Sequence, residues 1–139
     1  MASIPAAARA VLEGDGLAHL VTVGSDGAPQ VSCVWVGIED EEIVFASLGP
    51  RRKLDNIARD PRVALSIETA ETGPLGLLNY LVVHGTARIT EGGGPELLQR
   101  LAYVYLGPGV KFPPMDDPPP GVVVRITPER LGGAGPWAR

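Results

Sequence analysis

The feature that most constrains the fold is a series of β-rich runs separated by short turns and helical segments. Six such runs, all rich in β-branched residues, follow one another at residues 16–23, 30–38, 43–47, 62–69, 79–91 and 122–127. The first two flank the turn 25–29, whose Asp26-Gly27 pair is typical of a β-hairpin. Gly85 lies inside the longest run, where it predicts a bulge or kink. This order favours an antiparallel sheet, and it does not alternate as βαβ units do.

Three short helices are expected between these strands. Residues 4–12 carry apolar residues at helical spacing, residues 51–60 are amphipathic and end before Pro61, and a third helix begins at Pro95 and stops at Gly107. Six strands in 139 residues favour a closed or nearly closed barrel, because closure removes exposed strand edges. We therefore expect one domain, residues 1–139, that is mainly β with short helices and has a single core.

The charge and the cysteine content narrow the class of protein. The formal net charge is −4, which argues against broad binding to nucleic acids or to anionic membranes. Cys33 is the only cysteine and cannot form an internal disulfide, and no apolar run reaches the length of about 18 residues that a membrane helix needs. A soluble, cytoplasmic protein is expected. His19, His84 and Cys33 lack the paired spacing of metal ligands, so no metal site is expected either.

A basic cluster stands at the start of the expected helix 51–60. Arg51, Arg52 and Lys53 follow Gly49 and Pro50 directly. The first turn of a helix carries partial positive charge, so each cation there costs a few tenths to about 1 kcal/mol unless an anion is bound. Cations and helix N–H groups together can hold a phosphate, and a glycine lets a ligand approach the backbone closely. The alternative is a solvated basic turn that pairs with nearby acids, and the residues alone leave both interpretations open.

The sequence offers no catalytic constellation beside this cluster. It contains no Ser-His-Asp order, no Walker loop and no GxGxxG motif. Cys33 is expected to be a buried structural thiol, and the aspartates of the turns are expected to make local hydrogen bonds. When a cofactor carries the reactive centre, the protein need supply only binding, orientation and electrostatics. We therefore assign the anion to a cofactor and leave the catalytic residues unknown.

The order "QVSCVWV", "IVFAS", "GPRRKLDNIARDPRVALSIE" and "LVVHGTARI" resembles the pyridoxamine 5′-phosphate oxidase-like, split β-barrel superfamily of flavin-binding proteins. The resemblance extends from about Leu17 to Ile126, is strongest in the run K-x-x-N-I-x-x-D-P-R-V at 53–63, and looks closest to the F420 (deazaflavin)-dependent oxidoreductases of actinobacteria. It implies a split β-barrel and a homodimer with cofactor sites between the subunits. It also implies hydride transfer between F420 and an electron-poor small molecule such as an enone, a quinone or a tetrapyrrole.

The resemblance also implies which residues bind the cofactor. They are Ser32, Val34, Ser47, Leu48, Gly49, Pro50, Arg51, Lys53, Asn56, Asn79 and Tyr80. Arg51 and Lys53 match the phosphate ligands, and Asn56 supports them one helical turn further on. Ser32, Val34 and Ser47 match positions that line the ring or the ribityl chain, and Asn79 and Tyr80 match positions that reach the cofactor from the partner subunit. Arg52 is expected to face solvent.

Two other functions stay open on the same barrel. An FMN-dependent oxidase or reductase would suit Arg51 and Lys53 equally well, because FMN carries one phosphate. A non-enzymatic carrier or sensor of flavin or haem is the third hypothesis, with His19 and His84 as the haem ligands to test. The proline-rich segment 107–121 is either a lid over the substrate opening or a disordered connector.

Overall fold

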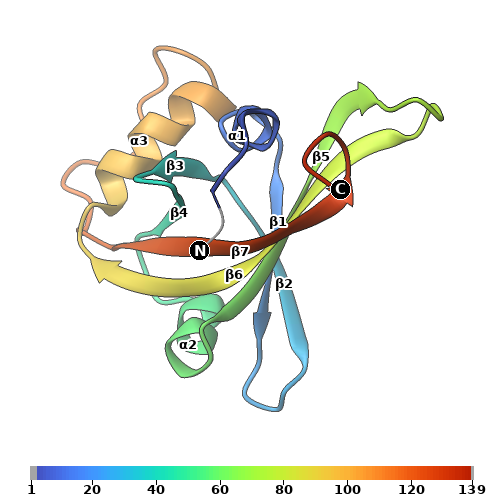
Figure 1. The fold of residues 1–139 in the computed structure, drawn as a ribbon. Helices are drawn as coiled ribbons and strands as arrows, with labels where there is room; N and C mark the ends of the chain where they lie inside the picture. Colours follow the sequence, from blue (N-terminus) through green and yellow to red (C-terminus); the bar gives the residue numbers. More distant parts are fainter. Residues whose placement is uncertain (1–2, 139) are drawn as a thin grey trace.

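The computed structural model describes residues 3–138 (Figure 1). In chain order its elements are α1 (Ala6–Leu12), β1 (Ala18–Val23), β2 (Pro29–Val34), β3 (Gly37–Glu39), β4 (Glu42–Ser47), α2 (Arg52–Arg59), β5 (Arg62–Thr72), β6 (Leu78–Glu91), α3 (Gly94–Tyr105) and β7 (Val122–Ala134). The strands form one antiparallel sheet in the order β2-β1-β5-β6-β7-β4-β3. The prediction of a mainly β fold with short helices is confirmed. No helix within residues 3–138 is long and apolar enough to cross a membrane.

The sheet has one strand more than the sequence predicts, because the run 30–38 divides in two. β2 pairs with β1 at one edge of the sheet, whereas β3 pairs with β4 at the other edge. Trp35 and Val36 connect them, and the backbone N–H of Val36 donates to the hydroxyl of Tyr105 instead of a strand, at 3.1 Å. The chain therefore links the two edges directly, and the sheet curls into a split barrel.

The long strand β6 bends at the predicted position. Its register against β7 shifts between His84 and Gly85, so that His84 lies opposite Arg130 and Gly85 opposite Pro128. A Cβ atom at Gly85 would collide with the carbonyl oxygen of Thr127. Glycine is required there because the bulge brings two backbones together, and the bend lets the sheet close.

The core has two parts, on opposite faces of β4. Phe45 and Ile43 point into the barrel, where they join a cluster of buried residues that includes Leu20, Leu65, Leu81 and Ile126. Val44 points outward against α3, whose Leu97 and Leu101 form a second, smaller cluster with Val123. Helices α1 and α2 lie at opposite ends of the barrel, and α3 lies beside β4 (Figure 1).

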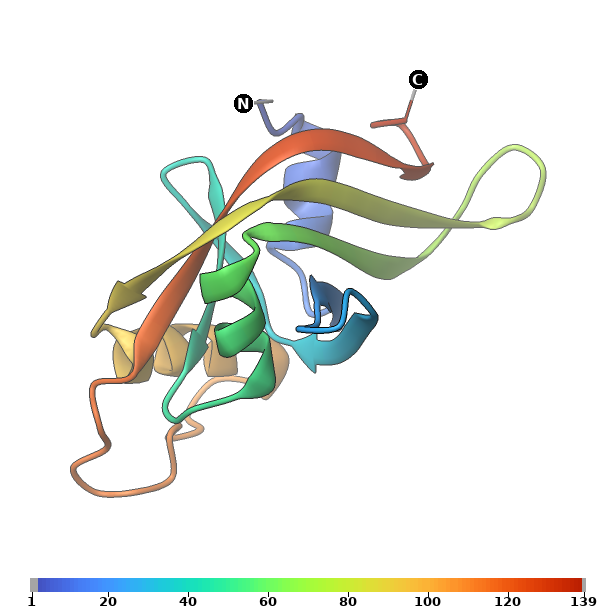
Figure 2. The same ribbon diagram turned by 90° about the horizontal axis from the view of Figure 1, so that it is seen from below.

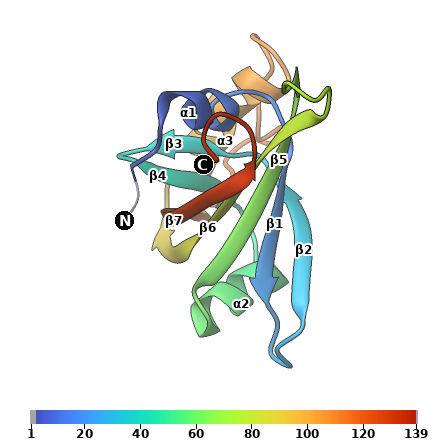
Figure 3. The ribbon, with the colours of Figure 1, turned by 45° about the vertical axis from the view of Figure 1, so that its right-hand side comes forward.

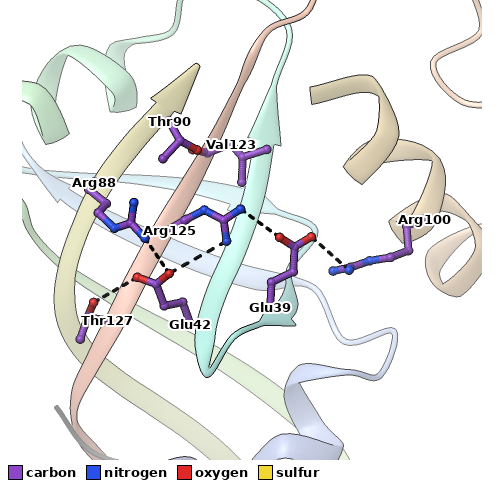
Figure 4. A network of polar contacts seen from close by, with 8 residues as sticks. All are labelled: Glu39, Glu42, Arg88, Thr90, Arg100, Val123, Arg125 and Thr127. Atoms are coloured by element: carbon purple, nitrogen blue, oxygen red, sulfur yellow. Dashed lines mark hydrogen bonds and ion pairs between the residues drawn. The ribbon is translucent and has the colours of Figure 1, made fainter. Parts of the chain in front are cut away.

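An ion-pair network ties the β3–β4 hairpin to the rest of the sheet (Figure 4). The guanidinium of Arg125 on β7 lies 3.0 Å from Glu39 and 4.0 Å from Glu42. Arg100 of α3 pairs with Glu39 at 3.1 Å, and Arg88 of β6 pairs with Glu42 at 2.9 Å. Both carboxylates are more than two thirds buried, so the network holds the short edge strand β3 in place.

The outer face of the sheet is covered by α3 at β4 and β7 but carries no helix at β5, β1 and β2. Strands β5, β1 and β2 lie side by side with their outer face uncovered (Figure 3). On β5 the outward positions include Arg62 and Glu68, one at each end of the region that pairs with β1. Between them, the central outward positions of β1, β2, β5 and β6 are His19, Val21, Val31, Cys33, Ala64, Ser66, Val82 and His84. We call these eight residues the outer sheet face. It includes no Asp, Glu, Lys or Arg, and Val31 is 61% exposed.

The β5–β6 hairpin projects beyond the body of the sheet (Figure 2). Its tip carries Leu75, Leu77 and Leu78, which are 87%, 68% and 53% exposed. A tip with three exposed leucines is unusual for a surface turn, where polar residues predominate. The hairpin and the outer sheet face are two of the places where the described residues leave apolar side chains open to solvent, and the end of α3 with the loop after it, at Tyr103, Val104, Leu106, Val110 and Met115, is another.

Candidate functional site

A cavity of about 410 Å³ lies where β2, β4, α2 and α3 meet the loop 107–121. Its lining residues are Leu17, Cys33, Val34, Trp35, Ala46, Ser47, Leu48, Arg51, Lys53, Leu98, Phe112 and Met115. Two of them, Arg51 and Lys53, are cations, and most of the others are apolar or aromatic. The loop and the turn before α2 lie next to each other at this place (Figure 2).

The turn between β4 and α2 places the two cations at the cavity. The hydroxyl of Ser47 donates to the carbonyl of Gly49 at 2.8 Å, which fixes the turn as the strand ends. Arg51 is the N-cap residue of α2 in an extended conformation (φ −144°, ψ 152°) and makes no side-chain cap. Its guanidinium donates to the carbonyl of Pro50 at 2.9 Å. The helix therefore starts beside the cavity without a side chain covering its first N–H groups.

The electrostatics of this turn favour a bound anion. Among the ion pairs of residues 3–138, none involves Arg51, Arg52 or Lys53. Burial lowers the pKa of Lys53, and the neighbouring charge of Arg51 lowers it further. Within the described part of the chain, Arg51 and Lys53 thus stand close together at a helix N-terminus without a carboxylate partner. The pairing with nearby acids that one interpretation assumed is thus not seen among the described residues, Arg51 and Arg52 are exposed, and a bound anion at this turn stays a prediction.

Arg52 and Asn56 point away from this cavity. Arg52 is exposed, as predicted. Asn56 is only 2% exposed, and its amide donates to the Thr22 hydroxyl and to the Gln30 side-chain oxygen, both at 3.0 Å. Its own carbonyl oxygen accepts from Arg59 at 2.9 Å. The side-chain nitrogen of Asn56 thus ties α2 to β1 and β2, its side-chain oxygen is bound within α2, and the residue does not line this cavity.

The other predicted residues fall into two groups. Val34, Ser47 and Leu48 line the cavity together with Arg51 and Lys53. Ser32, Gly49, Pro50, Asn79 and Tyr80 do not line it. Gly49 and Pro50 form the turn before α2, and Ser32 is half-buried on β2 opposite Leu20. Asn79 and Tyr80 lie at the start of β6, directly after the hairpin tip, and neither lines the cavity beside the basic turn.

The prediction for Cys33 is wrong. The thiol is exposed and lines the cavity, whereas the sequence suggested a buried structural cysteine. The physical reason is that β2 is an edge strand and Cys33 points to its uncovered outer side. Cys33 belongs both to the cavity and to the outer sheet face, so the two are continuous.

An aromatic cluster that the sequence reasoning missed forms part of the cavity wall. Trp35 stacks on Tyr105 with ring centres 5.3 Å apart and packs against Phe112 at 5.1 Å. The hydroxyl of Tyr105 accepts from Val36 and donates to the carbonyl of Gly16 at 3.0 Å. Burial raises the pKa of Tyr105, which keeps this hydroxyl protonated as a donor. The cluster therefore holds the Trp35 ring in a fixed place beside the cavity.

The two histidines do not belong to this cavity. His19 and His84 lie on the outer sheet face, opposite Ser66 and Ala64 of β5 respectively. Neither lines the cavity that contains Arg51 and Lys53.

Similarity to known proteins agrees with this fold. The family model of pyridoxamine 5′-phosphate oxidase matches residues 4–133. Over 89 residues the chain is 33% identical to a 5a,11a-dehydrotetracycline/5a,11a-dehydrooxytetracycline reductase of Streptomyces rimosus. That match covers 61% of this chain and 63% of the reductase, so the chain spans less than two thirds of this relative.

Two solved structures resemble the whole fold. One is an F420 reductase, with a TM-score of 0.74 and 28% identity over 93% of this chain and 98% of that one. The other is the conserved hypothetical protein Rv2991 from Mycobacterium tuberculosis, with a TM-score of 0.72 and 28% identity over 99% and 88% of the two chains. Because the family model covers nearly the full length and the fold agrees, this chain belongs to the pyridoxamine 5′-phosphate oxidase family.

Proposed function

We propose that this protein is an F420-dependent oxidoreductase that transfers a hydride between the deazaflavin and an electron-poor small molecule. The observation that carries the proposal is the pair Arg51 and Lys53, which line a largely apolar cavity at the start of α2 and have no counter-ion among residues 3–138. The names of the similar F420 reductase and of the dehydrotetracycline reductase support the same class of reaction.

The donor set of the cavity fits a ligand that has both a phosphate and a flat ring. Two cations and the uncapped helix start suit a phosphate, because charge-assisted hydrogen bonds to phosphate are the strong ones. Val34, Leu48 and Trp35 offer the apolar and aromatic surface that a ring system needs. When bound, the deazaflavin would supply the hydride. The protein's part is to hold the phosphate, orient the ring and exclude water.

A second candidate, an FMN-dependent oxidase or reductase, rests on the family match. The same two cations would hold the single phosphate of FMN. The two are separated by titrating the purified apo-protein with F420 and with FMN and following the fluorescence of each cofactor. Binding of F420 in the micromolar range or tighter supports the proposal. Tight binding of FMN together with no binding of F420 would replace it by the second candidate.

The proposal includes a homodimer in which each copy completes the cavity of the other. The outer sheet face is uncharged, and Cys33 connects it to the cavity. A second copy packed on this face would therefore also form part of the cavity wall. The projecting hairpin, with its exposed leucines followed directly by Asn79 and Tyr80, provides the segment that would reach across. Sedimentation equilibrium of the wild-type protein tests this, and a monomer at micromolar concentration would contradict it.

The substrate is the remaining part of the proposal. Enones, quinones and tetrapyrroles are the electron-poor acceptors to test with reduced F420, and 5a,11a-dehydrotetracycline joins them because a relative is named for its reduction. Oxidation of the reduced cofactor is followed by its absorbance, with the Lys53→Met variant as the control for turnover at this site. A location in the cytoplasm stays a prediction from the sequence.

A further inference from the structure

The loop 107–121 contributes a wall to the cavity although it contains no regular secondary structure. Six of its fifteen residues are prolines, and two others, Phe112 and Met115, line the cavity. The sequence left open whether this segment is a lid or a disordered connector. In the structure a side chain of α3 makes hydrogen bonds to the backbone of this segment.

Gln99 binds the loop backbone with both ends of its side-chain amide. Its nitrogen donates to the carbonyl of Val110 at 2.8 Å, and its oxygen accepts from the N–H of Phe112 at 3.0 Å. The amide thus pairs with the backbone on both sides of Lys111, as a neighbouring strand would. The ion pair of Lys111 with Asp116 closes the loop on itself, but both side chains are largely exposed, and such pairs contribute little. The two ends of the loop are held by backbone hydrogen bonds, from the N–H of Gly107 to the carbonyl of Ala102 and from the N–H of Gly94 to the carbonyl of Pro120. Gln99 is therefore the side chain of α3 that binds the middle of the loop.

The tether has a direct consequence for the cavity. It places the ring of Phe112 against Trp35, which in turn is stacked on Tyr105. Leu98, the residue before Gln99, also lines the cavity. One turn of α3 therefore contributes Leu98 to the cavity wall, and Gln99 in the same turn binds the loop that contributes Phe112 and Met115. Both hydrogen bonds of Gln99 are exposed to solvent, so they can break and form again without a large cost.

We infer that Gln99 is a positioning residue that holds Phe112 and Met115 as a wall for the ring-bearing part of the ligand, while Arg51 and Lys53 hold its phosphate. This inference rests on the proposed function for the identity of the ligand. It predicts that the tether controls affinity for the ring and leaves affinity for a bare anion unchanged.

The test compares three variants of the full chain. Gln99→Leu removes both hydrogen bonds, and Gln99→Glu keeps an acceptor for the N–H of Phe112 but loses the donor to Val110. Glu96→Gln is the matched control, because Glu96 is an exposed residue of the same helix. Two quantities are measured: hydrogen exchange of the Phe112 amide in the free protein, and the affinities for F420 and for inorganic phosphate, the latter by competition.

In Gln99→Leu the Phe112 amide should exchange about tenfold faster, and F420 should bind about five- to tenfold more weakly, in keeping with the loss of exposed hydrogen bonds. Phosphate affinity should not change, Gln99→Glu should be intermediate, and Glu96→Gln should behave as wild type. Unchanged exchange at Phe112, or an equal loss of affinity for F420 and phosphate, would overturn the inference. If the wild-type protein binds neither F420 nor FMN, the proposed function fails, and the exchange of Phe112 alone decides whether Gln99 positions the loop.

Discussion

Replacement of Lys53 by methionine separates the binding role of this residue from any role in folding. The Lys53 side chain lines the cavity, is partly buried and lies beside the charge of Arg51. Methionine keeps most of the apolar stem and removes only the ammonium group. If Lys53 donates a charge-assisted hydrogen bond to a phosphate, its loss should weaken binding by about 1.5–3 kcal/mol, which is a factor of about 10 to 150 in Kd.

The same substitution should leave the stability of the free protein unchanged or slightly higher. Burial and Arg51 lower the pKa of Lys53 from its ordinary value of 10.5. A lowered pKa means that the charged form is less favourable in the folded chain than in the unfolded chain, so at neutral pH the ammonium disfavours folding. This penalty disappears only as the pH rises through the lowered pKa toward 10.5. Methionine removes it at every pH.

The assay is a fluorescence titration with F420 between pH 6 and 10, together with thermal unfolding of the free protein. In the wild-type protein, affinity should fall at alkaline pH as Lys53 loses its proton, and this dependence should be absent in Lys53→Met. The matched control is Arg52→Met, which removes an equal charge from the next position, where the side chain is exposed and lies outside the cavity. If Arg52→Met weakens binding as much as Lys53→Met does, the effect is a general electrostatic one and the reasoning fails. Unchanged affinity in Lys53→Met would also refute it.

Three further predictions concern the frame around the site. Asn56→Leu should lower the free energy of unfolding by about 1–3 kcal/mol, because it removes the hydrogen bonds to Thr22 and Gln30. The folded variant should still bind F420 with wild-type affinity, and a weaker affinity in fully folded protein would show that Asn56 belongs to the binding site. Arg125→Met leaves Glu39 and Glu42 without their shared partner, so it should lower the free energy of unfolding, measured in urea, by about 1–3 kcal/mol. The control Arg88→Met, at a side chain that is 59% exposed, should lower it by less than about 1 kcal/mol. Val31→Arg places a charge on the outer sheet face, so the protein should sediment as a monomer. The Cys33 thiol should then react faster with a thiol label, and F420 should bind more weakly. A dimer of wild-type stability would show that the two copies meet elsewhere.

The local features of the fold were predictable because their signals lie close together in the sequence. The Asp26-Gly27 hairpin, the bend at Gly85 and the start of α2 each depend on a few neighbouring residues, and the structure has all three. The division of the run 30–38 was not predictable in the same way. Trp35 and Val36 have high β propensity, but the sheet has no strand for them to pair with at the crossing between its two edges. Tertiary topology overrides propensity there.

The candidate site shows the same division between local and long-range signals. Arg51 and Lys53 stood out because three cations at a helix start are costly without an anion, which is a property of one short segment. Trp35, Leu98, Phe112 and Met115 carry no such signal. They meet only because the crossing of the barrel edges, α3 and the loop 107–121 converge, and their residue types are those of any apolar core. The charged part of this cavity can be predicted from one short segment of the sequence, whereas its apolar wall depends on the tertiary fold.

The error over Cys33 has a different origin, and it bears on the dimer. The sequence pattern around Cys33 predicts burial because Val21, Val31 and Cys33 are residue types that are usually buried. In the single chain, however, this surface is uncovered. A hydrophobic pattern reports the environment in which a residue is buried, and that environment can be a second subunit as well as the chain's own core. One cause can thus explain three features: the outer sheet face is uncharged, it is continuous with the cavity through Cys33, and the sequence pattern there predicts a buried thiol. All three are accounted for if a second copy covers this face and closes the cavity beside Arg51 and Lys53.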